Sequence, residues 1–216
     1  MGTFNIVART NESTVVSEYA STTARSTAYQ SEADLEQEFI KLLCEQGYTY
    51  LPIHSEAELV SNLRTPLELL NEYSFTEDEW ARFFRDVIAN PQEDALEKTR
   101  KLQEGDSIQL LDRDDGSHKN IMLIDKEHIH NNRLQVINQY VVTAEDGAKH
   151  DNRYDVTVLV NGLPLVHIEL KRRGVAIRQA FNQINRYDRD SFWAGSGLYN
   201  YVQIFVISNG THTKYY

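Results

Sequence analysis

The chain has 216 residues, with 41% hydrophobic and 25% charged residues. These values are ordinary for a soluble globular protein and leave room for one large domain or two small ones. No apolar run reaches the roughly 18 residues that a membrane-spanning helix needs, so we expect no membrane partner. The net charge of −10 argues against non-specific nucleic-acid binding over the whole surface.

The charge is unevenly distributed along the chain. Residues 31–98 contain 16 Asp and Glu against 5 Lys and Arg, whereas residues 151–190 contain 5 Asp and Glu against 7 Lys and Arg. A local site in the second segment can therefore meet phosphates although the protein is acidic. The one cysteine, Cys44, excludes an internal disulfide and fits a reducing, cytoplasmic location. We expect it to be a packed core thiol beside Leu42 and Leu43.

The first 30 residues are rich in Thr, Ser and Ala and show weak periodicity. They predict a loosely ordered N-terminal arm, with one short strand around Phe4–Val7. Ser31 then has the character of a helix N-cap, with Asp34 three residues later in place of the usual Glu. The expected helix ends before Gly47 and is followed by a short strand over Tyr48–Ile53. Its apolar face is expected to consist of Leu35, Phe39, Leu42 and Leu43.

Residues 55–103 predict a helical insertion. Ser55 begins a helix with leucines at helical spacing, and Pro66 is a point where that helix could be interrupted. Thr76, with Glu79 at the capping-box position, begins the next helix. Pro91 ends that helix and can open another that runs to about Leu102. The acidic residues lie opposite the apolar stripes, which indicates a solvated face; this face is also the best candidate surface for docking to partner subunits.

From residue 107 onward the pattern changes to strands separated by turns. Strands are expected at Ile108–Leu111, Ile121–Ile124, Leu134–Val142, Tyr154–Val160, Leu165–Lys171, Val202–Ile207 and Thr211–Tyr216, with hairpin-type turns at Asp115-Gly116, Asn161-Gly162 and Asn209-Gly210. The run at 202–207 is apolar throughout, as a central strand covered on both faces would be. One helix is expected between these strands, at about Val175–Arg189. The pattern as a whole predicts an α/β domain over residues 31–216.

The stretch RYDVTVLVNGLPLVHIELKRRG, residues 153–174, brings three charged residues together. Asp155 and Glu169 are equidistant from Gly162, so a three-residue loop would place them directly opposite each other, while a two-residue loop would shift them by one residue. Lys171 is two residues after Glu169 and therefore points to the same face of its strand. Two carboxylates and an ammonium are expected to converge at one end of a sheet.

These charges lie in apolar runs, where they are costly unless they are paired or bound to a cation. Carboxylate oxygens are the ligands that Mg²⁺ prefers. Lys171 cannot bind a metal while it is protonated, but it can orient a water or stabilise a phosphate oxyanion. The competing interpretation is a structural charge network on an edge strand. The histidines, including His150 and His167, show no metal-ligand spacing, and a supporting role for His167 beside Glu169 is the weaker hypothesis.

Polar residues after the charged strand extend this pattern. Arg172, Arg173 and Arg178 follow directly, as phosphate-contacting side chains would. Gln183 and Tyr187 lie one turn apart on the same side of the expected helix. Alone they would be unremarkable surface residues.

Asp155, the Glu169-Leu170-Lys171 triplet, and Gln183 with Tyr187 together resemble the PD-(D/E)xK nuclease signature with a QxxxY motif. That combination is typical of the N-terminal nuclease domain of type I restriction enzyme R subunits and of the RecB-like nucleases. The segments SEADLEQEFIKLLCEQGYTYLPI, NRYDVTVLVNGLPLVHIELKRRG and AFNQINRY carry the resemblance. The Asp–ExK pattern alone is weak, but the three segments in this order are specific. Tyr154 replaces the Pro of the motif's name, at a position that varies.

The resemblance implies roles for individual residues. Asp155, Glu169 and the main-chain carbonyl of Leu170 would bind one or two Mg²⁺ or Mn²⁺ ions, and Lys171 would assist the attacking water. An acidic residue on the first helix would join them, with Glu36 the best match and Glu38 its competitor. Gln183 and Tyr187 would organise the site or hold DNA.

The resemblance also implies a fold and a context. The fold would be a restriction-endonuclease-like core, with a mixed central sheet flanked by helices and the insertion at 55–103. The resembled subunits carry an ATP-driven helicase motor after this domain; because no P-loop is present, this chain should cut double-stranded DNA without binding ATP or translocating. Partner modification and specificity subunits would read the DNA sequence. The alternative is a catalytically idle nuclease-like domain that serves docking or regulation.

Overall fold

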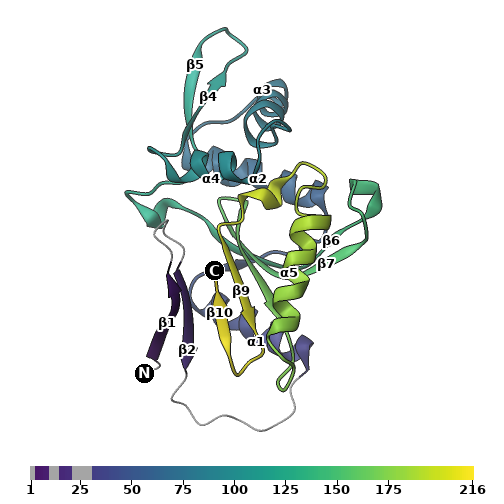
Figure 1. Ribbon diagram of the computed structural model, residues 1–216. Coiled ribbons are helices and arrows are strands. Elements are labelled where there is room, and N and C mark those ends of the chain that lie inside the picture. The colour runs from purple at the N-terminus through teal and green to yellow at the C-terminus, as the bar shows by residue number, and fades with distance from the viewer. Residues whose placement is uncertain (1–2, 10–14, 21–30) are drawn as a thin grey trace.

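The computed structural model describes residues 3–9, 15–20 and 31–216 and contains one large mixed sheet. Its strand order is β1-β2-β10-β9-β8-β7-β6-β3 (Figure 1). The strands are β1 (Thr3–Arg9), β2 (Val15–Ala20), β3 (Thr49–Tyr50), β6 (Leu134–Val142), β7 (Asn152–Val160), β8 (Leu163–Leu170), β9 (Ile204–Ser208) and β10 (Thr213–Tyr215). The pairs β3–β6 and β8–β9 are parallel and the other neighbours are antiparallel, which confirms the expected mixed sheet.

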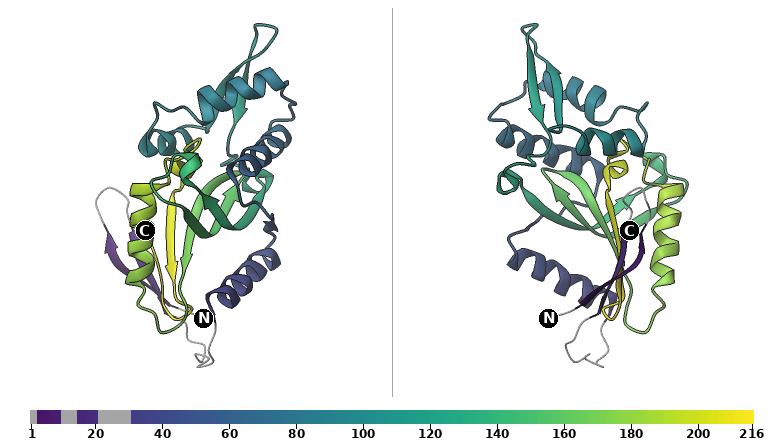
Figure 2. Two further views of the ribbon diagram at one scale, coloured as in Figure 1. Left: turned by 90° about the vertical axis from the view of Figure 1, so that its right-hand side faces the viewer. Right: turned by 60° about the vertical axis from the view of Figure 1, so that its left-hand side comes forward.

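Two helices cover opposite faces of this sheet (Figure 2). They are α1 (Glu32–Glu45) and α5 (Arg178–Asp190). Short 3₁₀ turns complete the connections, at Ile129–Asn131, Ala144–Asp146 and Leu198–Tyr201. The arrangement confirms an α/β architecture. The strand expected near Phe4–Val7 is found as β1, while the remainder of the expected N-terminal arm lies outside the described residues.

Helix α1 begins as expected, but its buried face is rotated away from Leu42 and Cys44. Ser31 and Asp34 form a reciprocal capping box. Ile40 and Leu43 are buried against the sheet, but Leu42 is 47% exposed and Cys44 is also exposed. The expectation that Leu42 and Cys44 pack in the core was therefore wrong. The reason is helical geometry: positions 36, 40 and 43 form the buried stripe, with Leu35 and Phe39 partly buried beside it, and positions 42 and 44 lie outside it.

Helices are found, as expected, within residues 56–103, the segment predicted to be an insertion. It contains α2 (Glu56–Leu70), α3 (Glu77–Phe83), a π-helical turn (Phe84–Ile88) and α4 (Ala95–Gln103). Helix α2 runs without interruption through Pro66, which is buried with its leucines, so packing of that face outweighs the lost backbone hydrogen bond. The strands β4 (Ile108–Asp112) and β5 (His118–Met122) form a separate hairpin beside these helices. The strand expected at Ile121–Ile124 begins three residues earlier.

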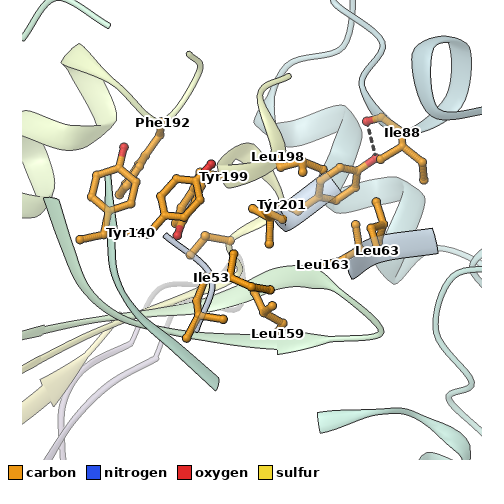
Figure 3. Packing of buried hydrophobic residues seen from close by; sticks show 14 of the residues in the cluster. Ile53, Leu63, Ile88, Tyr140, Leu159, Leu163, Phe192, Leu198, Tyr199 and Tyr201 are labelled. Atoms are coloured by element: carbon orange, nitrogen blue, oxygen red, sulfur yellow. Dashed lines mark hydrogen bonds between the residues drawn. The ribbon is translucent and has the colours of Figure 1, made fainter. Parts of the chain in front are cut away.

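One hydrophobic core joins the insertion to the sheet (Figure 3). Leu63 of α2 packs with Leu163 of β8, and the Tyr201 hydroxyl donates a hydrogen bond to the carbonyl of Ile88 at 3.0 Å. A Cβ atom at Gly162 would lie 2.6 Å from the Cα of Leu63, so the β7–β8 turn touches the α2 backbone directly. The insertion therefore holds in place the turn that aligns β7 with β8.

None of the helices in residues 31–216 combines the length and the apolarity that crossing a membrane requires.

Candidate active site

The β7–β8 hairpin brings the two strand carboxylates together. Its turn has two residues, Asn161 and Gly162, both with positive φ as a tight hairpin turn demands. Leu165 is an extra residue on β8, because Val158 pairs with Val166 while the next residue pairs with Pro164. This bulge restores the residue lost in the short turn. The register Val156↔Ile168, carried one residue further, places Asp155 opposite Glu169.

Asp155 is held against the backbone of the neighbouring strand. Its Oδ2 accepts a hydrogen bond from the amide of Leu170 at 2.9 Å. Burial raises the pKa of Asp155 to about 7, and the neighbouring Glu169 carboxylate adds to the rise. Asp155 is therefore a carboxyl that ionises fully near neutral pH only if a positive charge approaches it.

Glu169 is completely buried and only partly satisfied. The Lys171 ammonium donates to Glu169 Oε1 at 3.0 Å and to the carbonyl of Leu170 at 3.0 Å. Oε2 has no hydrogen-bond partner. Burial raises the pKa of Glu169, and the Lys171 ammonium and a hydrogen bond with the Asp155 carboxyl oppose that rise. The ammonium thus occupies the space between the two oxygens that the sequence analysis assigned to a metal.

His167 lies beside Glu169 without completing its hydrogen bonding. Its Nε2 is 3.6 Å from Glu169 Oε2, which is too long for a hydrogen bond, and neither ring nitrogen has a partner. Burial lowers the pKa of His167 to about 4, so the ring is neutral near pH 7. It therefore offers Glu169 no counter-charge.

Glu36 approaches the same region from α1. It is 6% exposed, and its two oxygens accept hydrogen bonds from the side-chain amides of Asn138 and Gln139. Burial raises the pKa of Glu36, while the two amides oppose the rise. The competing residue Glu38 is exposed on the same helix. Of the two, only Glu36 faces a cavity that contains Asp155.

Two neighbouring cavities of about 320 and 340 Å³ meet at Asp155. Both are also lined by Glu32 and Arg153, which the sequence analysis missed. No spacing could have revealed them, because they flank the motifs on α1 and β7 and reach the site only through the fold. The first cavity is completed by residues that include Lys171, Gln183, Arg186 and Tyr187, and the second by residues that include Glu36, Gln139 and Leu170.

Gln183 and Tyr187 form a connected pair on α5. The Gln183 amide donates to the Tyr187 hydroxyl, which in turn donates to the carbonyl of Arg153 at 2.8 Å. Tyr187 is only 1% exposed. The pair therefore ties α5 to β7 two residues before Asp155, while also lining the first cavity.

The three expected arginines are not all equivalent. Arg172 and Arg178 are exposed, and the Arg172 amide donates to Glu32 Oε1 at 3.2 Å. Arg173 is half-buried, with its side chain close to Gly210 in the β9–β10 turn. None of the three lines either cavity beside Asp155.

The donor set suits a hard cation with few protein ligands. No group of three or more His, Cys, Asp and Glu side chains that could hold a metal ion exists within the described part of the chain. Two facing carboxylates remain, Asp155 and Glu169, with an unpartnered oxygen on the second and the Leu170 carbonyl beside it. Mg²⁺ is usually held by one or two carboxylates and keeps several waters, so these residues fit it.

Residues 29–216 match the protein family described as type I restriction enzyme R protein N terminus. The EcoprrI endonuclease subunit of a type I restriction enzyme from Escherichia coli is 46% identical over 211 residues, which is 97% of this chain and 66% of that protein. A type I endonuclease subunit from Staphylococcus saprophyticus is 39% identical over 192 residues, 87% of this chain and 19% of that protein. The chain thus spans just under two thirds of the first relative and about a fifth of the second.

Proposed function

Because the chain belongs to the family of type I restriction enzyme R protein N-termini, we propose that it is the domain that cuts DNA in such an enzyme. The chemistry is metal-dependent hydrolysis of phosphodiesters, on a restriction-endonuclease-like core. The observation that carries the proposal is the placement of Asp155 opposite Glu169, with the Lys171 ammonium bridging Glu169 and the Leu170 carbonyl. The mixed sheet between α1 and α5 supports the proposed core.

Asp155, Glu169 and the Leu170 carbonyl would hold Mg²⁺, with Mn²⁺ as a substitute. When bound, such an ion supplies a polarised water and neutralises charge on the phosphate. A structural charge network predicts instead that each buried carboxylate is paired with a positive charge, but the Lys171 ammonium pairs with Glu169, and Asp155 faces the Glu169 carboxyl, which raises its pKa. Glu36, on the far side of the second cavity, adds a further carboxylate to the walls around Asp155.

Lys171 holds a proton at the centre of the site. Its side chain is 13% exposed and it lines the first cavity, so its ammonium can turn from Glu169 towards a phosphate oxygen or the attacking water. An ammonium at this point stabilises negative charge that develops on the phosphate. Lys171 is therefore the residue proposed to assist the water.

DNA would approach the open side of the two cavities. Arg172 and Arg178 are exposed at the end of β8 and the start of α5, where they can contact phosphates of double-stranded DNA, and Arg173 is proposed to support this edge. Gln183 and Tyr187 would organise the cavity wall, since their hydrogen bonds fix the backbone of Arg153 beside it. No described element has the character of a base-reading module, which fits sequence recognition by other subunits.

The rest of the enzyme is proposed from the family. The E. coli and S. saprophyticus relatives are longer than this chain. We propose a helicase motor that binds ATP, and modification and specificity subunits as partners, in the cytoplasm. The acidic faces of the insertion at 56–103 are the proposed docking surface. A nuclease-like module without activity is the competing function.

The test uses the complete R subunit assembled with its partner subunits. Asp155→Ala, Glu169→Ala and Lys171→Ala should each reduce DNA cleavage by at least about 100-fold, while ATP hydrolysis persists. Glu38→Ala is the matched control, because Glu38 is an exposed carboxylate on α1 that lines neither cavity. Wild-type cleavage by any of the three variants would remove that residue from the site. Unchanged cleavage in all three would favour the docking module.

A further inference from the structure

Two consecutive residues of β6 hold the Glu36 carboxylate. Asn138 donates from its Nδ2 to Glu36 Oε1, and Gln139 donates from its Nε2 to Glu36 Oε2. The Tyr50 hydroxyl donates to Asn138 Oδ1 at 2.9 Å. That bond fixes the amide so that its NH₂ group faces the carboxylate.

Neighbouring side chains on a strand normally point to opposite faces of the sheet. Here both reach one carboxylate, because Gln139 has a φ of 53°. It also drops out of the β6–β7 ladder: Asn138 pairs with Val156 and Tyr140 pairs with Tyr154, so the unpaired position is the one facing Asp155. The left-handed backbone turns the Gln139 side chain towards α1.

This backbone conformation is strained for a residue other than glycine. The other described non-glycine residues with positive φ include Asn161, in a hairpin turn, and Glu72, just after the end of α2. Both are places where the left-handed conformation is usual. Gln139 lies in the middle of a nine-residue strand, where no turn or helix end accounts for it. Strain of this kind persists where the surrounding structure enforces it, and it clusters at active sites.

We propose that Gln139, together with Asn138, is a positioning residue that aims Glu36 at the metal site, and that the left-handed backbone at Gln139 is retained for this purpose. The inference rests on the proposed function, in which Glu36 is a carboxylate of that site. Gln139 lines the second cavity, and its proposed action is through Glu36, whose carboxylate it holds.

The test is Gln139→Gly, which removes the amide and relieves the strained backbone in one change. Mg²⁺ and Mn²⁺ affinity of the chain is measured by calorimetric titration, and thermal unfolding is measured in the absence of metal. We expect the dissociation constant to rise at least about tenfold, while the melting temperature changes little, because relief of the strained backbone offsets the lost hydrogen bond to Glu36. A residue with only a structural role would lower the melting temperature or leave metal affinity unchanged.

Glu72→Gly is the matched control. It also relieves a left-handed residue, but at the end of α2 and away from both cavities. It should leave metal affinity unchanged. Gln139→Gly with wild-type metal affinity overturns the proposal, as does an equal loss in Glu72→Gly.

Glu36→Gln separates this inference from the function on which it rests. Glu36→Gln should weaken metal binding and DNA cleavage, and the double variant with Gln139→Gly should be no weaker than Glu36→Gln alone, because the amide has lost its target. Additive losses in the double variant overturn the inference and leave the function standing. Wild-type metal binding and cleavage in Glu36→Gln overturn the role of Glu36, and the inference with it.

Discussion

Two buried glutamates, one in the insertion and one in the sheet, differ in how the fold hydrogen-bonds their carboxylates. Glu79 of α3 is 3% exposed and accepts hydrogen bonds from the Tyr73 hydroxyl at 2.7 Å and from the amides of Thr76 and Asp114, both at 3.1 Å. Burial acts to raise the pKa of Glu79, but these donors hold it below its usual value. Glu169 of β8 is 0% exposed, with the Lys171 ammonium on one oxygen, no N–H donor on the other, and a second carboxyl, Asp155, beside it.

The difference separates a carboxylate that the fold satisfies from one that the proposed function assigns to a metal ion. In the insertion, donors of the fold satisfy both carboxylate oxygens of Glu79, so its charge stabilises the folded state. At the end of the sheet the chain supplies too few donors, and the pKa values of Asp155 and Glu169 are both raised by burial. A buried carboxyl with too few donors either stays protonated or takes a partner from outside, and the proposed function assigns that partner to a metal ion.

Glu169→Gln gives the largest effect expected from this contrast. The neutral amide keeps an acceptor for Lys171 and is less costly to bury, so stability should change by no more than about 1 kcal/mol. Cleavage by the complete enzyme should fall by at least about 100-fold. Thermal unfolding and a DNA cleavage assay measure the two quantities. A large loss of stability would place Glu169 in the same class as Glu79.

The metal-free chain should lose stability as pH rises through the window from about 4 to about 7. Asp155 has a pKa near 4 when unfolded and about 7 when folded. The folded state therefore binds more protons in this window, and its stabilisation is full below the unfolded pKa and lost as pH passes the folded pKa. The loss is of the order of 1–4 kcal/mol. Chemical denaturation at a series of pH values measures it, and Asp155→Asn should flatten the curve.

Mg²⁺ or Mn²⁺ should raise the melting temperature of the chain. The ion binds only the folded site, and a concentration of 100 times the dissociation constant adds about 2.7 kcal/mol. Such a gain corresponds to roughly 5–11 °C for a chain of this length. Asp155→Ala should remove most of the shift, whereas Ca²⁺ should bind without supporting cleavage. Equal affinity in wild type and Asp155→Ala would place the ion elsewhere, such as on the acidic insertion.

Glu79→Gln should show the reverse of Glu169→Gln. The amide nitrogen cannot accept a hydrogen bond, so at least one donor among Thr76, Asp114 and Tyr73 loses its partner, at a cost of roughly 1–3 kcal/mol. Cleavage below the melting temperature should be unchanged. Unfolding in urea and the DNA cleavage assay test the pair of outcomes, and a variant that is stable but inactive would contradict the contrast.

Tyr187→Phe should have the smallest effect. It removes the hydroxyl that links Gln183 to the Arg153 carbonyl but keeps the buried ring. Cleavage should fall by about tenfold, with the fold intact by circular dichroism. Phe181→Leu is the control, because Phe181 is 39% exposed on the same helix and lines neither cavity. Normal cleavage by both Tyr187→Phe and Gln183→Ala would show that the QxxxY motif, Gln183 and Tyr187, has no role in cleavage.

The sequence by itself determined the local elements and the residues of the hairpin. Hydrophobic periodicity and helix-capping residues predicted α1, the helices of the insertion and most strands. Burial of one face and hydrogen bonding of the groups at helix ends are both local requirements. The spacing of Asp155, Glu169 and Lys171 predicted that their side chains converge. The spacing left the loop length open between two and three residues. The turn has two residues, and the bulge at Leu165 places Asp155 directly opposite Glu169.

Only the tertiary structure decided which residues of each element face the site. The choice between Glu36 and Glu38 depended on which stripe of α1 meets the sheet, and the same docking left Leu42 and Cys44 exposed. Glu32 and Arg153 reach the cavities from separate elements, and Gln139 turns towards Glu36 through a backbone conformation that no residue pattern signals. Periodicity encodes the faces of one element, whereas the contacts between elements arise from packing distant segments together, which no spacing along the chain records.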